Sequence, residues 1–329
     1  MNEVRKSIGV DVGKEKLDVC YPDGTKETIR NIKSCRTKLI TKAKKLDAII
    51  AFEATGPYEE ALADECLAKG VKAVRLDAWG TRRFAESQGR LEKTDAIDSE
   101  MIRDYAMSLK EDRLRFIKPQ SQSHKQLRNA NVSRKNLMKA KSILYNQLEH
   151  LPNCEAKHKL IKNIEALCKS IEEVEKICDK AINDDERMQN LFVRFQQVNG
   201  IGPCTARTML ACCPDIGEFT KRGIAKMCGN APLEHKSCTI QKKSRTKRGR
   251  SDLKHVLHMA AVSAVKSNHI LREFYLRLLS KGKPKRVALT AVARKLAILM
   301  NTIAKYPNFN PAQNSKDIAR RKALDTLTS

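Results

Sequence analysis

The sequence contains few aromatic residues, a deficit of acidic residues, and no long uninterrupted run of apolar residues. Aromatic residues make up 5% of the 329 residues, with Trp79 as the single tryptophan. Stacking of bases on aromatic rings is therefore a minor expected mode of nucleic-acid binding. No stretch approaches the roughly 18 consecutive apolar residues of a membrane span. The N-terminal segment has no apolar run of the kind found in secretory signals, so we do not expect one.

The eleven cysteines include no C-x-x-C pair, which argues against a zinc ribbon and against a thioredoxin-type redox site. We therefore expect reduced thiols that pack as small apolar side chains in a cytosolic protein. His255 and His258 lie three residues apart in an apolar helical segment, and this setting favours packing over metal binding.

Positive charge is what the chain has in excess. Lys and Arg number 64 against 38 Asp and Glu, a formal net charge of +26. A charge of this size repels itself unless a polyanion is present, so nucleic acid is the expected partner. Basic residues are concentrated between 241 and 254 and again between 281 and 286. In the first cluster we expect phosphate contacts from Lys242, Lys243, Arg245, Lys247, Arg248 and Arg250.

Residues 1–118 predict a mixed α/β domain, because a hairpin of short apolar strands is followed by alternating helices and strands. The expected elements are, in order, strands over 7–12, 16–21 and 25–30, a helix over 35–45, a strand over 47–52, a helix over 57–69, a strand over 71–76 and a helix over 95–107. The strand over 47–52 is apolar on both faces, which is typical of a buried central strand.

Residues 119–190 predict a helical region that is either a spacer or an oligomerisation arm. Between 121 and 185 glycine is absent and Pro152 is the one proline, while apolar residues recur at helical and partly heptad spacing. We expect two long helices, joined near 151–154, that form an antiparallel hairpin or coiled coil.

Residues 191–329 predict a mainly helical domain. Gly200 and Gly202 stand where a helix-hairpin-helix turn lets backbone amides approach a phosphate at a helix N-terminus; a plain glycine turn is the alternative. We expect a helix over 219–229, a loop over 230–250, and helices beyond it.

Four acidic residues of the first domain stand where strands end and a helix begins. Asp11 ends the first strand, and Glu53 ends the buried strand; Asp95 and Asp98 lie three residues apart in the first turn of a helix. Converging carboxylates repel one another, and a divalent cation such as Mg²⁺ removes that repulsion. A two-metal cluster suits phosphodiester chemistry. For any one of them alone, a solvated or helix-capping role is the alternative.

Three segments of the first domain resemble a known family. They are IGVDVGK at 8–14, FEATG at 52–56 and KTDAID at 93–98. These segments resemble the RuvC-like DEDD transposases of insertion sequences, a family that includes the Piv-type DNA invertases. The segments GIGP at 200–203, PDIGEF at 214–219, CGNAP at 228–232 and TKRG at 246–249 follow the order of that family's second domain.

The resemblance implies an RNase H-like first domain whose Asp11, Glu53, Asp95 and Asp98 bind Mg²⁺, and a nucleophilic serine at Ser237 in the second domain. It also implies a covalent DNA–serine intermediate, guidance by a structured bridge RNA, and homodimers that pair into tetramers. The family usually has Gly after this serine, where the present sequence has Cys238, and Ser244 is the alternative position. The expected function is a transposase or site-specific recombinase that cuts and rejoins DNA at element ends and target sites.

Three other interpretations stay open. A RuvC-like Holliday-junction or DNA endonuclease would use the carboxylates without Ser237. A non-catalytic nucleic-acid-binding protein would need neither. A sugar kinase shares the phosphate-binding type of hairpin at 8–14, but the charge of +26 and the missing glycine-rich adenosine motif argue against it.

Overall fold

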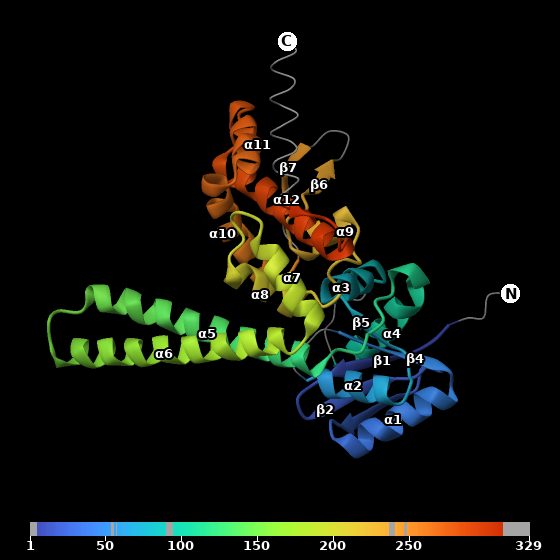
Figure 1. Cartoon of the computed structure of the whole chain (residues 1–329). Helices are drawn as coiled ribbons and strands as arrows, with labels where there is room; N and C mark the ends of the chain where they lie inside the picture. The colour runs from blue at the N-terminus through green and yellow to red at the C-terminus, as the bar shows by residue number, and fades with distance from the viewer. Residues whose placement is uncertain are drawn as a thin grey trace, which may run out of the picture. The chain divides into compact units, whose positions relative to one another are not determined.

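The chain divides into two compact units, Met1–Pro119 and Gln120–Ser329, and each has its own core (Figure 1). The computed structural model describes residues 5–53, 56, 58–89, 95–236, 241–246 and 249–311. At 95–97, 233–236 and 241–245 it describes the backbone alone.

The first unit is built on a five-stranded mixed sheet with the strand order β3-β2-β1-β4-β5. The strands are β1 (Lys6–Val12), β2 (Lys16–Cys20), β3 (Lys26–Arg30), β4 (Ala48–Glu53) and β5 (Ala73–Leu76). The first three pair antiparallel, whereas β4 lies parallel to β1 and β5 lies parallel to β4. All five predicted strands are therefore confirmed, with small shifts at their ends.

Helices cover both faces of this sheet (Figure 1). They are α1 (Lys33–Lys45), α2 (Glu60–Ala68), α3 (Ala78–Ser87) and α4 (Asp95–Ser108), followed by a 3-10 turn at Glu111–Arg113. The predicted helix over 57–69 begins later, at Glu60, and α3 is an additional helix that the sequence pattern did not predict.

Alternate residues of the central strands pack against two different layers. Val10 and Phe52 lie in the core that α1 and α2 cover, whereas Ala51 lies in a second core with Ile102 and Ala106 of α4. Because side chains alternate along a strand, β4 must be apolar on both faces to fill both cores. The predicted burial of this strand is thereby confirmed.

Helix α4 lies directly against the backbone of β1 at Gly9. A Cβ atom on Gly9 would overlap the carbonyl oxygen of Ser99 and would lie 2.9 Å from the Cβ of Arg103. At the start of β1, the Arg5 Nη1 donates to the Leu109 carbonyl, just beyond the end of α4, at 2.9 Å. Therefore α4 runs antiparallel to β1, and its N-terminal end lies over the C-terminal end of that strand.

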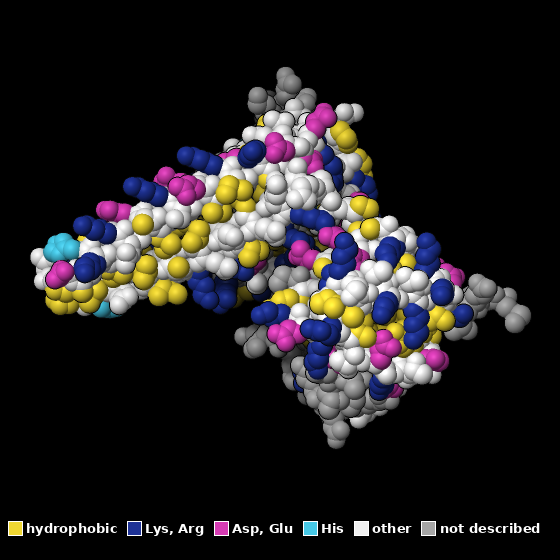
Figure 2. All heavy atoms as spheres, turned by 90° about the horizontal axis from the view of Figure 1, so that it is seen from below, with side chains coloured by type: hydrophobic (Ala, Val, Ile, Leu, Met, Phe, Trp, Pro, Cys, Tyr) yellow, Lys and Arg dark blue, Asp and Glu magenta, His cyan; other side chains and the backbone are white. Residues whose placement is uncertain are grey.

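The second unit begins with the two predicted long helices, α5 (Gln122–His150) and α6 (Glu155–Asn183), which lie side by side as an antiparallel arm (Figure 1). Apolar side chains gather along this arm (Figure 2). Some of them are exposed, with 48% of Val132, 57% of Ile143 and 53% of Ile177 accessible to solvent.

An ion-pair network at the base of the arm joins α5 and α6 to α8 (Pro203–Cys212). Arg207 donates to both oxygens of Asp179, each at 2.7 Å, and Arg134 donates to Glu175 at 2.6 Å. Burial raises the pKa of Glu175, but the two guanidinium groups prevail and leave it below its usual value. The network fixes α8 on the arm.

Within its described residues, the rest of this unit is helical apart from one hairpin. Its elements are α7 (Glu186–Gln196), α8, α9 (Lys221–Met227), β6 (Leu233–Lys236), β7 (Gln241–Arg245), α10 (Ser251–Ser267), α11 (His269–Ser280) and α12 (Lys285–Lys305). The prediction of a loop over 230–250 was wrong, because β6 and β7 pair antiparallel within it. Both strands are largely polar and lack the apolar alternation by which a strand is predicted.

Among the helices that the structure describes, α12 alone is long and apolar enough to cross a membrane, although Arg294 and Lys295 interrupt its apolar sequence. Its Leu296 and Met300 have no exposed surface and belong to the core of the second unit. Burial of this kind is typical of a central helix in a packed domain. Every cysteine that the structure describes is a free thiol, as the spacing of the cysteines predicts.

The contact at Gly9 yields a first prediction. Gly9→Ala is expected to destabilise the first unit by about 3 kcal/mol, because a buried methyl group would push α4 off β1. Trp79 on α3 is the only tryptophan, so its fluorescence reports thermal unfolding of this unit. Ser7→Ala is the control, since Ser7 is fully buried on the same face of β1. Equal melting temperatures for the two variants would contradict the role given to Gly9.

Candidate functional site

Two of the predicted acidic residues lie side by side at the C-terminal ends of β1 and β4. These parallel strands pair Gly9 with Ala51 and Val10 with Phe52, and the next residues along them are Asp11 and Glu53. Gly9 and Ala51 face α4, so the residues two positions further on face α4 as well. Both carboxyl groups are half-buried.

The N-terminal end of α4 supplies the other two acidic positions. Ser99, which is 1% exposed, sits above Gly9, and Asp98 precedes it with a half-buried side chain. Position 95 lies about one helical turn before Ser99, on the same side of the helix, while the side chain of Asp95 lies outside the described residues. The backbone therefore directs all four predicted positions to one edge and one face of the sheet.

Contacts to β2 and β3 hold α4 in this place. Lys26 on β3 forms an ion pair with Glu100 at 2.6 Å, and the Arg103 Nη1 donates to the Tyr21 carbonyl at 3.1 Å and to the Cys20 sulfur at 3.2 Å. Burial raises the pKa of the Cys20 thiol, and the nearby guanidinium opposes this shift only in part. Cys20 therefore stays a neutral thiol beneath the helix.

A fifth carboxylate, Asp18, lies next to this group and was not predicted. The antiparallel ladder pairs Asp11 directly with Asp18, whose side chain accepts a hydrogen bond from the Thr28 hydroxyl. Asp18 is 8% exposed, and one of its oxygens lies 3.3 Å from the Lys16 Nζ. The sequence predicted strands over 7–12 and 16–21 without their register, and it is the register that places positions 11 and 18 opposite each other.

The residues at this edge fit a divalent cation in their chemistry and placement. Carboxylate oxygens are the hard ligands that Mg²⁺ prefers, and they come from two adjacent strands and one helix end. The described side chains do not by themselves form a group of three or more metal-binding residues, and that search does not include the side chain of Asp95. Asp11, Glu53, Asp95 and Asp98 are the residues that would hold the ion.

In the second unit, α7 and α8 flank the turn at Gly200 and Gly202, an arrangement that both the helix-hairpin-helix prediction and its plain-turn alternative require. Gly200 has a φ of 104°, and a Cβ there would lie 2.7 Å from the Ala264 nitrogen of α10. The structure therefore gives Gly200 a packing role. Gly202 is the exposed residue before Pro203, the first residue of α8. Phosphate binding at this turn stays a prediction.

The hairpin β6–β7 is anchored where its two ends meet. Gly249, with a φ of 99°, packs against the backbone of Gly229, and a Cβ there would lie 2.7 Å from the Met227 carbonyl oxygen. The Arg250 amide donates to that same carbonyl at 2.9 Å. The Arg250 side chain donates to the Cys212 carbonyl. This part of the chain thus leaves and re-enters the helical core at one point.

Several predicted residues belong to this hairpin but lie outside what the structure describes. Ser237 and Cys238 fall in the segment 237–240, which joins Lys236 to Gln241, and Lys247 and Arg248 form a second such segment. Only the backbone of β7 is described, so the side chains of Lys242, Lys243, Ser244 and Arg245 are not placed. Of the six basic residues predicted to contact phosphate, Arg250 has a described side-chain contact, its hydrogen bond to the Cys212 carbonyl.

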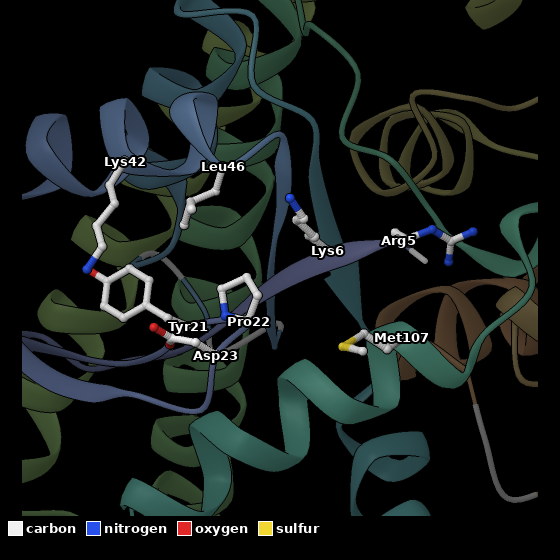
Figure 3. A pocket seen from close by; sticks show the side chains of 8 residues that line it. All are labelled: Arg5, Lys6, Tyr21, Pro22, Asp23, Lys42, Leu46 and Met107. Carbon is white, nitrogen blue, oxygen red and sulfur yellow. The ribbon is translucent and has the colours of Figure 1, made fainter. Parts of the chain in front are cut away.

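The first unit also contains a pocket of about 430 Å³ (Figure 3). It is lined by Arg5, Lys6, Tyr21, Pro22, Asp23, Lys42, Leu46 and Met107. Arg5 and Lys6 stand at the start of β1, at the opposite end of the strand from Asp11. Lys42 reaches over the Tyr21 ring, with its Nζ 3.3 Å from the ring centroid, so a neighbouring side chain already covers this ring. The pocket is therefore separate from the acidic edge.

The strand order and the acidic edge are consistent with an RNase H-like catalytic domain of an enzyme that acts on DNA. Comparison with protein families agrees. Residues 8–151 match a transposase family model, that of the DEDD transposases of the IS110 type, and residues 193–276 match the model described as "Transposase IS116/IS110/IS902 family".

These two matches cover more than half of the chain, which belongs to the IS110 family of insertion-sequence transposases. No match was found among curated proteins. The family indicates a soluble, cytoplasmic enzyme that cleaves and rejoins DNA in transposition, with a divalent metal ion that is typically Mg²⁺.

The anchored hairpin yields a second prediction. Gly249→Ala is expected to lower DNA cleavage at least tenfold, because the added Cβ would separate the two ends of the hairpin. Gly282→Ala is the matched control: Gly282 has a φ of 69°, and no described atom lies within 4 Å of a Cβ there. The control also replaces a glycine of positive φ, but without the clash. Equal activity in the two variants would contradict this account of the hairpin.

Proposed function

We propose that this transposase cuts and rejoins DNA at the ends of an insertion sequence, with Mg²⁺ held by Asp11, Glu53, Asp95 and Asp98 and with Ser237 as the nucleophile. The observation that supports the metal site most directly is the sheet register. It aligns Asp11 with Glu53 on one face, beneath the helix end that carries the other two positions.

In this proposal, the hydroxyl oxygen of Ser237 forms a bond to the scissile phosphorus and gives up its proton. The bond from phosphorus to the leaving deoxyribose oxygen breaks, and that oxygen takes up a proton. The reverse reaction, with another DNA end as the attacking alcohol, rejoins the strand. When bound, Mg²⁺ lowers the pKa of a hydroxyl group and stabilises the charge that develops on the phosphoryl oxygens. The carboxylates orient the ion and the phosphate.

Substrate binding is assigned to the basic segment that follows Ser237. Lys242, Lys243, Arg245, Lys247, Arg248 and Arg250 would neutralise backbone phosphates, and the exposed turn at Gly202 would offer backbone amides to another. Such contacts hold DNA without reading its sequence.

Sequence recognition is assigned to a structured bridge RNA, and assembly to homodimers that pair into tetramers. The low aromatic content supports a protein that contacts phosphates more than bases. The exposed apolar side chains of the α5–α6 arm, among them Val132 and Ile143, support the arm as the surface through which copies associate.

The metal site yields a third prediction. Asp11→Asn and Glu53→Gln are each expected to reduce DNA strand cleavage at least 100-fold, because each keeps the size of the side chain but removes a negative ligand. Binding of duplex DNA should stay within about threefold, since phosphate contacts come from basic residues. Asp112→Asn, at an exposed carboxylate of the same unit, is the control. Full cleavage by Asp11→Asn would show that the carboxylates are not catalytic.

The nucleophile yields a fourth prediction. The wild-type protein, denatured during reaction with labelled DNA, is expected to retain label in a covalent adduct, and Ser237→Ala is expected to lose that adduct completely. Ser244→Ala should retain it. Loss with Ser244→Ala instead would move the nucleophile to that position. Cleavage by Ser237→Ala at the wild-type rate without an adduct would favour the endonuclease interpretation.

A further inference from the structure

We propose that Asp18 is a positioning residue for the metal ligand Asp11, and that its charge sets how tightly the acidic edge binds a divalent cation. This inference rests on the metal site of the proposed function. It concerns a residue outside the four acidic positions of the family motif.

The sheet register places Asp18 directly beside Asp11. Asp11 and Asp18 are direct partners in the antiparallel ladder of β1 and β2, so their side chains project from the same face. Directly opposed residues have Cβ atoms about 4.5–5.5 Å apart. Continuing outward, Asp18 is the direct partner of Thr28 on β3. Glu53, Asp11, Asp18 and Thr28 therefore form a polar row across four adjacent strands.

Both oxygens of the Asp18 carboxylate are held by neighbouring side chains. The Thr28 hydroxyl donates to Oδ1, and the Lys16 Nζ lies 3.3 Å from Oδ2. These two contacts hold both oxygens of the Asp18 carboxylate, and the Thr28 contact comes from β3, on the side away from Asp11. The Asp18 side chain is 11% exposed, whereas that of Lys16 is 53% exposed. The carboxylate is thus an ordered, buried charge, and Lys16 compensates it from the solvent side.

The electrostatic consequence follows from this arrangement. Like charges directly opposite each other in a sheet are destabilising, and a cation bound at Asp11 relieves that repulsion. Asp18 therefore favours a bound cation, while Lys16 disfavours one. Removing either residue should change cation affinity, and the two changes should have opposite signs. A purely structural role for this ion pair predicts no such reversal.

The test measures Mn²⁺ binding directly, by electron paramagnetic resonance of the free ion during titration of the full-length protein without DNA. Asp18→Asn keeps the acceptor for Thr28 and is expected to weaken Mn²⁺ binding about tenfold. Lys16→Met is expected to strengthen it about threefold, less because Lys16 is half exposed and solvent screens its charge. The Mg²⁺ concentration for half-maximal cleavage should shift in the same two directions.

Three controls complete the experiment. Thr28→Val removes the hydroxyl without changing charge, and Asp23→Asn removes a negative charge in the exposed turn between β2 and β3. Asp23→Asn should shift Mn²⁺ affinity less than twofold, and Thr28→Val should weaken it less than Asp18→Asn does, because the Asp18 charge is kept. Fluorescence of Trp79 reports whether each variant is folded, and Lys16→Met still tests the inference if Asp18→Asn is not.

The outcomes separate this inference from the function on which it rests. If Asp11→Asn abolishes Mn²⁺ binding while Asp18→Asn and Lys16→Met leave it unchanged or shift it the same way, Asp18 has no positioning role and the inference is overturned. If Asp11→Asn itself leaves Mn²⁺ binding intact, the proposed metal site fails, and the inference fails with it.

Discussion

The backbone contact between α4 and Gly9 of β1 is the constraint on which the acidic edge depends. No other residue allows the Ser99 carbonyl to lie so close to the strand, because any Cβ would occupy that space. Because the helix packs so closely on the strand, its first turn lies next to the end of β1 that carries Asp11. The Arg5–Leu109 hydrogen bond at the far end fixes the direction of the helix. The acidic positions at this edge are thus brought together by a residue that has no side chain of its own.

The acidic edge is rich in negative charge, whereas the chain as a whole is strongly positive. The chain carries a net charge of +26, yet acidic residues converge here with cations placed around them. Lys26 pairs with Glu100, and Lys16 pairs with Asp18, each on a neighbouring strand and not on β1 or β4. Basic side chains therefore stabilise the scaffold of the edge from the side of β2 and β3.

Short apolar segments bounded by turn residues made the five strands of the sheet predictable, and the two-sided burial of β4 followed from its apolar residues. Features that depend on close contacts between distant segments could not be predicted. The polar hairpin β6–β7 was missed because neither strand is an apolar segment. For the site, strand ends and helix starts were enough to select Asp11, Glu53 and Asp98. Asp18 required the register of the hairpin, and the packing role of Gly200 required the position of α10, which no local pattern contains.

Both units use glycine residues to bring two backbone segments into direct contact. In each, glycine lets two backbone segments lie in direct contact close to residues that the proposed function uses: Gly9 lies two residues before Asp11, and Gly249 packs against Gly229 where the two ends of the β6–β7 segment meet. A side chain at such a point would separate the elements by about the diameter of a methyl group, and misplacement of a reacting group by about 1 Å can cost about 100-fold in rate. At Gly9, this backbone contact brings α4 over the face of β1 that carries Asp11, while Asp11 itself stays half-buried.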